Sequence, residues 1–307
     1  MSLLAILISL ALEKLLPIID GWRHWSWFGP FSQGVRNQLN KHPHLRGIPT
    51  ILLILVLPMA GVGVVQLLLN DILALLGFIF SFIVLTYCLG PKDPHRLVHK
   101  YLDAVEAGDI TAEETLEEIL QQTPPEDPTE RTTALVNTIL IQTHERLFAV
   151  LFWFIVLGPI GAVLYRLTLE QSYQLQTNQD EDTEFRAAVD NLHYLLAWIP
   201  SHLAILSYAV MGSFVHALHA WKKKAEPAAE AKAETTGEEN VEAAISTSTS
   251  QPEHYRLLQR IGLGALQFET KLVHNHNAVR ETLGLCGRSL IAWVTVLALL
   301  TLAGWVS

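Results

Sequence analysis

Cysteine and charge are both scarce in this sequence. The 307 residues include two cysteines, Cys88 and Cys286, with no CxxC pair and no neighbouring histidine at zinc-ligand spacing. The sequence therefore predicts neither a disulfide framework nor a structural zinc site. Charged residues make up 17% of the chain and form no extended basic stripe, so no nucleic-acid partner is predicted.

The common nucleotide-binding and nucleophile motifs are also missing. The sequence has no GxxxxGK[ST] loop, no GxGxxG after a strand and no GxSxG elbow. Among its 13 histidines, His95 and His99 lie four residues apart, but no carboxylate at a suitable spacing completes a metal site. We therefore predict no catalytic residue, no cofactor and no metal ion.

Apolar residues, in contrast, make up 50% of the chain. About 20 consecutive apolar residues cross a hydrocarbon core of about 30 Å, and five segments meet this requirement, with residues 3–19 as a sixth candidate. The five segments are the two halves of 48–90, divided at Asn70 and Asp71, and the runs 147–167, 192–215 and 290–306. We predict an all-α integral membrane protein with about five to six transmembrane helices.

The polar segments between these runs give the expected organisation. Cytoplasmic amphipathic helices are predicted on both sides of a segment rich in Ala, Glu, Thr and Ser, which we expect to be disordered. Residues 1–90 are predicted to form N-terminal membrane helices with an aromatic-rich interfacial loop at 20–47, and residues 91–146 a cytoplasmic helical segment. Residues 147–216 are predicted to form a kinked membrane helix pair with an acidic periplasmic loop. A disordered cytoplasmic insert is expected at 217–252, followed at 253–307 by an amphipathic helix and the last membrane helix.

The distribution of positive charge predicts the topology. Eighteen of the 21 Lys and Arg residues fall in the segments 20–47, 91–146 and 216–289. Because cytoplasmic loops collect Lys and Arg, we assign these three segments to the cytoplasm. The acidic stretch QDEDTE at 179–184 is then predicted to be periplasmic, and Gly158-Pro159 is expected to kink the run 147–167 or split it into half-helices.

Polar side chains within or beside the apolar runs are the candidate functional residues, because such groups are expensive in a bilayer unless they face the protein interior. We expect Glu13 to face the helix bundle and to pair with a cation such as Arg146 or a histidine, or to be protonated. Arg166 and Asp190 have a simpler interpretation as residues that snorkel at the outer interface. His202 follows Pro200 within a predicted span.

Four segments resemble a known superfamily. They are LALEKLLP at 10–17, VHKYLDAVEAGD at 98–109, HERLFAVLFWFIVLGPIGAVLYRL at 144–167 and AAVDNLHYLLAWIPSHLAILSYAVMGSF at 187–214. Their order and their sequences are similar to those of the AmpE and CobD/CbiB superfamily of polytopic inner-membrane proteins. The resemblance covers most of the chain apart from the insert.

The details separate the two branches of that superfamily. CobD/CbiB enzymes join adenosylcobyric acid to an aminopropanol group, and they carry ENxSDG before an APLF stretch and NTLDS after the conserved Tyr. Here Ile141 replaces the first Glu, Glu145 aligns with the Asp, and RLTLEQSY follows Tyr165 without NTLDS. A synthase that binds ATP and magnesium would keep hard carboxylate ligands, so the chain resembles AmpE more closely. The family's Arg in WIPxRL is His202 here, and the Asp before Trp is Ala197.

This resemblance implies a signalling or sensory modulator of the bacterial inner membrane without its own catalysis. AmpE is associated with β-lactamase induction alongside a peptidoglycan-recycling amidase, and the expected partners are the lipid bilayer and a cytoplasmic or membrane protein. Two alternatives stay open: a membrane-bound enzyme related to CobD/CbiB amide synthases, and a transporter for a muropeptide-like solute. The candidate binding residues are Glu13, Glu145, Arg146, Arg166, Asp190 and His202.

Overall fold

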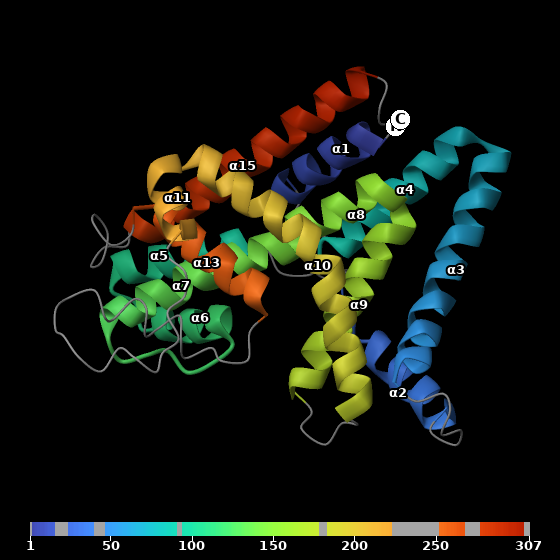
Figure 1. Cartoon of the computed structure of the whole chain (residues 1–307), viewed down its shortest axis with the longest axis horizontal. Helices are drawn as coiled ribbons and strands as arrows, with labels where there is room; N and C mark the ends of the chain where they lie inside the picture. Colours follow the sequence, from blue (N-terminus) through green and yellow to red (C-terminus); the bar gives the residue numbers. More distant parts are fainter. Residues whose placement is uncertain are drawn as a thin grey trace. The chain divides into compact units, whose positions relative to one another are not determined.

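The structure, a computed structural model, contains only helices among the residues that it describes. These residues are 2–15, 24–39, 47–90, 94–177, 183–222, 252–267 and 277–303. The predicted all-α class is thus confirmed, and Figure 1 shows the course of the chain. The predicted disorder of the insert, the end of the first apolar run and most of the acidic stretch lie outside the described residues.

Two compact units make up the chain. The first comprises Met1–Pro91, Glu145–Pro200 and Val294–Ser307. Its helices are α1 (Ser2–Leu15), α2 (Phe28–Leu39), α3 (Ile48–Ile72), α4 (Ala74–Cys88), the π-helical turn η3 (His144–Phe148) from Glu145 onward, α8 (Ala149–Leu157), α9 (Pro159–Thr177), α10 (Thr183–Met211) as far as Pro200, and the end of α15 (Asn277–Leu302).

The second unit comprises Lys92–His144 and Ser201–Trp293. Its helices are α5 (Pro94–Ala107), α6 (Thr111–Leu120), α7 (Pro128–Thr143), the remainder of α10, α11 (Phe214–Lys222), α13 (Glu253–Ala265) and most of α15. Helix α7 packs against α5, α6 and α13, and α13 also packs against α11. The expected helices of the segment 91–146 are therefore present, and Gly108, with a φ of 66°, separates α5 from α6.

Among the residues that the structure describes, four helical stretches are long and apolar enough to cross a membrane. They are Ile48–Ile72, Pro128–Leu157, Thr183–Met211 and Asn277–Leu302, and the stretches Leu3–Glu13 and Ala74–Cys88 are shorter apolar helices. A 25-residue helix such as α3 is about 37 Å long, enough for a hydrocarbon core of about 30 Å. These six apolar helices agree with the predicted membrane class.

Helices α3 and α4 form the hairpin that the sequence predicts, although the break falls at Leu73 rather than at Asn70 and Asp71. Leu73 has an extended backbone, with φ −160° and ψ 125°. Gln66 then joins the two helices, because its amide donates to the carbonyl of Gly77 at 3.2 Å. The Ser81 hydroxyl donates to Gln66 Oε1 at 3.1 Å, so the polar groups of this apolar hairpin bind one another.

The run 147–167 does not form the single kinked span that the sequence suggests. Gly158, with a φ of 67°, ends α8, and Pro159 begins α9, which packs against α8. Helix α8 has nine residues and is about 13 Å long, much less than the thickness of a hydrocarbon core. The half-helix alternative is therefore the correct one, and the chain reverses at Gly158.

Because the chain reverses at Gly158, the start of α10 lies at the same end of the first unit as the segment 20–47. A side-chain carbon at Gly47 would lie 3.8 Å from Cβ of Glu184, and Cζ of Arg36 lies 4.4 Å from the ring centroid of Phe185. Helices α2 and α9 also pack together at this end (Figure 1). Glu184, at the edge of the acidic stretch, thus lies beside the segment 20–47, whereas the positive-charge pattern assigns the two to opposite sides.

Candidate functional site

The turn η3 brings two of the candidate residues into the first unit. It is a π-helical turn of five residues, which widens the helix between α7 and α8. Such turns insert one extra residue per turn and frequently occur at functional sites. Both Glu145 and Arg146 lie on this turn, and they are 5% and 6% exposed, so the local geometry directs two charged side chains into the protein.

Arg146 pairs with Glu13, which is one of the alternatives that the sequence left open. The Nη2 group of Arg146 donates to Oε1 of Glu13 on α1, and the two side chains are 7% and 9% exposed. The Nε group of Arg146 donates to the carbonyl oxygen of Leu89 at 2.6 Å. Leu89 follows the last residue of α4, where backbone carbonyls lack helical partners and carry partial negative charge. One arginine therefore connects α1, η3 and the C-terminal end of α4.

Arg166 on α9 contacts the same end of α4. A Cβ atom at Gly90, whose φ is 85°, would lie 3.1 Å from both Nη atoms of Arg166, so the missing side chain of this glycine makes room for the guanidinium. Arg166 also pairs with Glu170 at 3.3 Å, and its Cζ atom lies 5.8 Å from the ring centroid of Trp25. Arg166 is 9% exposed, so the expectation that it snorkels at an interface is wrong.

Tyr173 is a member of this group that the sequence interpretation missed. Its hydroxyl donates a hydrogen bond to Oε2 of Glu145. In the sequence, Arg166, Glu170 and Tyr173 are spaced i, i+4 and i+7, the spacing of one helix face, although they follow an apolar run. That polar stripe beyond the apolar run is the signal that could have identified Glu170 and Tyr173.

The other two candidates are placed differently. Asp190 lies in α10 within the first unit, but its side chain is on the exposed surface. His202 is half-buried and belongs to the part of α10 in the second unit. The structure therefore gathers four of the six predicted residues, which with Glu170 and Tyr173 form what we call the charged cluster: Glu13, Glu145, Arg146, Arg166, Glu170 and Tyr173.

The chemistry of the charged cluster is that of paired charges. Two guanidinium groups and three carboxylates lie on α1, η3 and α9, and both guanidinium groups contact the end of α4. Cations near a helix C-terminus are favourable, and charge-assisted hydrogen bonds are stronger than neutral ones. Among the described residues, no group of three or more His, Cys, Asp or Glu side chains could hold a metal ion.

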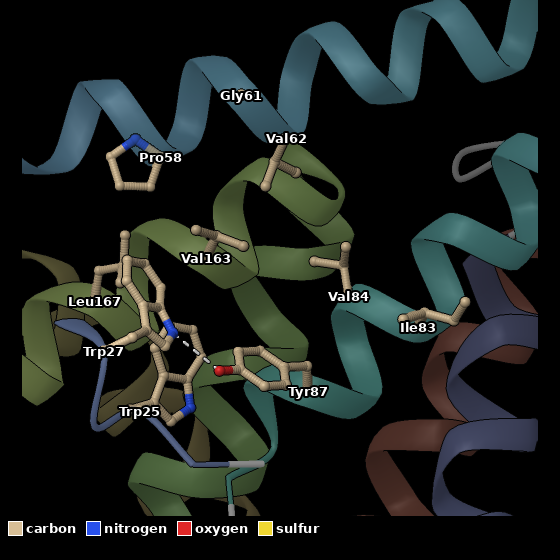
Figure 2. Close-up of a pocket in the computed structure, with 10 residues that line it drawn as sticks. All are labelled: Trp25, Trp27, Pro58, Gly61, Val62, Ile83, Val84, Tyr87, Val163 and Leu167. Carbon is tan, nitrogen blue, oxygen red and sulfur yellow. Dashed lines mark hydrogen bonds between the residues drawn. The ribbon is translucent and has the colours of Figure 1, made fainter. Parts of the chain in front are cut away.

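An apolar cavity lies in the same unit, between α3, α4 and α9. Its volume is about 450 Å³, and it is lined by Pro58, Gly61 and Val62 of α3, Val84 and Tyr87 of α4, and Val163 of α9, with further apolar side chains. Figure 2 shows Trp25, Trp27 and Tyr87 together at one end. At that end, Trp27 Nε1 donates to the Tyr87 hydroxyl at 3.0 Å, and this hydroxyl donates to the carbonyl of His24 at 2.8 Å.

Comparison with curated proteins finds similarity to both branches of the superfamily. The chain is 35% identical over 94 residues to the cobalamin biosynthesis protein CobD of Stutzerimonas stutzeri, and 30% identical over 92 residues to that of Chromobacterium violaceum. Each match covers 30% of this chain and 30% of the relative. Protein AmpE of Shigella flexneri is 28% identical over 141 residues, which are 44% of this chain and 50% of that protein.

The matched parts thus span half or less of the length of these curated relatives. No solved structure matches the chain. The model of the family described as "Regulatory signalling modulator protein AmpE" matches residues 1–232, most of the 307 residues and all of the segments that form the charged cluster. This chain is a membrane protein and belongs to the AmpE family.

Proposed function

We propose that this chain is a signalling modulator of the bacterial inner membrane, linked to β-lactamase induction and to signals from peptidoglycan recycling. The observation that carries the proposal is the match of the AmpE family model over residues 1–232. Similarity to the AmpE protein of Shigella flexneri over 141 residues supports the same assignment.

The charged cluster supports a signalling role in physical terms. Ionisable side chains among apolar membrane helices are costly, and they are retained where they serve function. The Glu13–Arg146 pair connects α1 to η3, and Arg146 also holds the end of α4. Any movement of α1 relative to η3 must separate a buried charge pair, so these helices favour discrete arrangements over gradual ones. A signal could act by shifting the balance between two such arrangements.

The test is a deletion in a host that carries an inducible β-lactamase. Induced β-lactamase activity is measured over a range of β-lactam inducer concentrations with the chain absent, and again with the wild-type chain restored. We expect the induction curve to shift on deletion and to return on complementation. Superimposable curves with and without the chain would contradict the proposed function.

A membrane-bound enzyme related to CobD is the second candidate, and the matches to two CobD proteins favour it. Glu145 aligns with an acidic residue of that branch and is hydrogen-bonded to Tyr173. Titration calorimetry of the purified chain with ATP and Mg²⁺ separates the candidates. Saturable binding that disappears in Glu145→Gln but persists in the surface variant Glu106→Gln would favour the enzyme, and no binding heat is expected for a modulator without catalysis.

For the partner, we propose a cytoplasmic protein that contacts the segment 91–146. This segment forms α5, α6 and α7, and α5 and α6 present charged, exposed faces. Reporter fusions at Glu126 and Lys223 are expected to report the cytoplasm. Cross-linking from a photoreactive residue at Glu118 should then capture a soluble protein, and a periplasmic reporter signal at Glu126 would contradict this assignment.

A further inference from the structure

The apolar cavity of the first unit has a composition that suits neither water nor a polar solute. Its walls are aliphatic and aromatic side chains. At the aromatic end the Trp27 indole already donates to the Tyr87 hydroxyl, which donates to the His24 carbonyl. A water molecule needs two or more polar partners, which the walls do not offer. An empty space of about 450 Å³ would deprive the lining side chains of dispersion contacts. The cavity therefore suits an apolar occupant.

The surroundings of the cavity indicate where that occupant comes from. Large apolar side chains next to it, Leu57 and Val64 on α3 and Ile83 on α4, are 59%, 56% and 55% exposed. In a membrane protein, exposed apolar side chains on long apolar helices face the hydrocarbon of the bilayer. The residue Gly61 is itself exposed and lines the cavity, so the opening lies on this surface. A lipid chain can enter sideways from the bilayer.

The packing of the helices limits the width of the occupant. Helices α3, α4 and α9 contact one another pairwise, and the cavity lies between them. A further helix, about 10–12 Å across with its side chains, does not fit between helices already in contact. A single hydrocarbon chain is much narrower. Gly61 contributes to the space, because a Cβ atom there would meet no other atom within 4 Å.

The end of the cavity that is lined by Trp25, Trp27 and Tyr87 is suited to the polar part of a lipid. Trp and Tyr side chains concentrate at membrane interfaces, where their rings contact apolar chains and their N–H and O–H groups contact polar ones. Trp25, which lines the cavity, has a buried indole N–H without a hydrogen-bond partner among the described residues. Because this nitrogen is buried, the Trp25 ring and not its N–H borders the cavity. Trp25 also lies against Arg166, so the aromatic end borders the charged cluster.

We propose that this cavity is a binding site for one acyl chain of a bilayer phospholipid, with the ester end of the lipid at Trp25, Trp27 and Tyr87. The site is separate from the ion pairs of the charged cluster, and its existence does not depend on the proposed signalling function. A bound chain completes the packing of α3 against α4 and α9, so the occupied protein is more stable than the empty one.

The test uses a substitution that fills the cavity. In Gly61→Phe, the added Cβ atom has open space and the ring extends from a residue that lines the cavity, and replacing glycine within a helix does not weaken the helix. Gly284→Phe is the matched control, because Gly284 is also exposed in a long helix, also has no atom within 4 Å of a Cβ position, and is not among the residues that line the cavity. Each protein is purified in detergent, washed extensively, and analysed for retained lipid by mass spectrometry of the intact protein.

We expect the wild type and Gly284→Phe to retain one phospholipid per chain and Gly61→Phe to lose it. A second measurement uses vesicles of phosphatidylethanolamine and phosphatidylglycerol with brominated acyl chains, which quench nearby tryptophans. Quenching should decrease in Gly61→Phe and in Trp27→Phe relative to Gly284→Phe. Equal retention and equal quenching in Gly61→Phe and the control would overturn the proposal. Retention of an isoprenoid lipid alone, or a Gly61-dependent dimer by light scattering, would overturn the choice of occupant.

Discussion

Glu13 and Arg146 form a buried ion pair although they lie 133 positions apart in the sequence. Removing one partner of such a pair leaves the other charge buried without compensation, which is strongly destabilising. The pair therefore serves as a constraint between α1 and η3, and its two members can be tested by the same measurement.

We predict that Glu13→Gln lowers the free energy of unfolding by about 3–5 kcal/mol, because it leaves the Arg146 charge buried and unbalanced. Thermal unfolding of the detergent-solubilised protein should show a lower midpoint. The double variant Glu13→Gln with Arg146→Gln should recover part of the loss, since neither charge then remains.

The control for this prediction is the exposed pair of Arg280 and Glu106, whose side chains are 49% and 57% exposed. Surface ion pairs are worth about 0–1 kcal/mol, so Glu106→Gln should change the midpoint little. Equal midpoints for Glu13→Gln and Glu106→Gln would show that Glu13 is an ordinary interfacial residue.

Gly90 is the second position with a specific structural requirement. Its φ of 85° is unfavourable for any residue with a Cβ atom, and that atom would press on both Nη atoms of Arg166. Gly90→Ala should therefore cost about 1–3 kcal/mol of stability through backbone strain alone. Gly34→Ala on α2 is the control, because no atom lies within 4 Å and alanine favours a helix. A Gly90→Ala protein as stable as the control would contradict the described backbone conformation of Gly90.

The contacts of Glu184 lead to a prediction about topology. Because Glu184 lies beside Gly47, and Phe185 lies beside Arg36, cysteines placed at Gln33 and Glu184 should react from the same side of the membrane. A cysteine that replaces Asn70, at the far end of α3, should react from the opposite side of the membrane. The measurement is labelling of intact spheroplasts with a membrane-impermeant maleimide. The two native cysteines are buried, so the background is low.

Opposite labelling of Gln33→Cys and Glu184→Cys would restore the topology that the positive-charge pattern predicts. The rule of positive charge averages over loops and cannot detect a helix that turns back. The packing of α9 back against α8 is the feature that separates the two topologies.

Much of the fold is predictable because hydropathy and helix breakers are local properties. The length of the apolar run predicts the two arms of the α3–α4 hairpin. Glycine and proline predict the short helices on either side of Gly108 and the start of the long helix at Pro128. For a related reason the sequence limited the state of Glu13 to a pair with a cation such as Arg146 or a histidine, or to protonation.

The reversal at Gly158 was not predictable, because Pro159 is equally compatible with a kink and with the first turn of a new helix. Contacts between α8 and α9, and the long-range contact between Glu145 and Tyr173, distinguish the two. The burial of Arg166 depends likewise on Gly90, a residue 76 positions earlier whose lack of a side chain makes the space. Hydropathy places Arg166 at the edge of an apolar run and contains no information about such a neighbour.

The proposed signalling role of the charged cluster can be tested by measuring the induced β-lactamase activity of a deletion host complemented with Glu13→Gln. Membrane insertion and the amount of each variant are measured in parallel by immunoblotting of isolated membranes. We predict that Glu13→Gln inserts but does not restore the wild-type induction curve, whereas Glu106→Gln restores it. Full complementation by Glu13→Gln at the wild-type membrane level would contradict the proposal that the charged cluster, through its buried Glu13–Arg146 pair, transmits the signal.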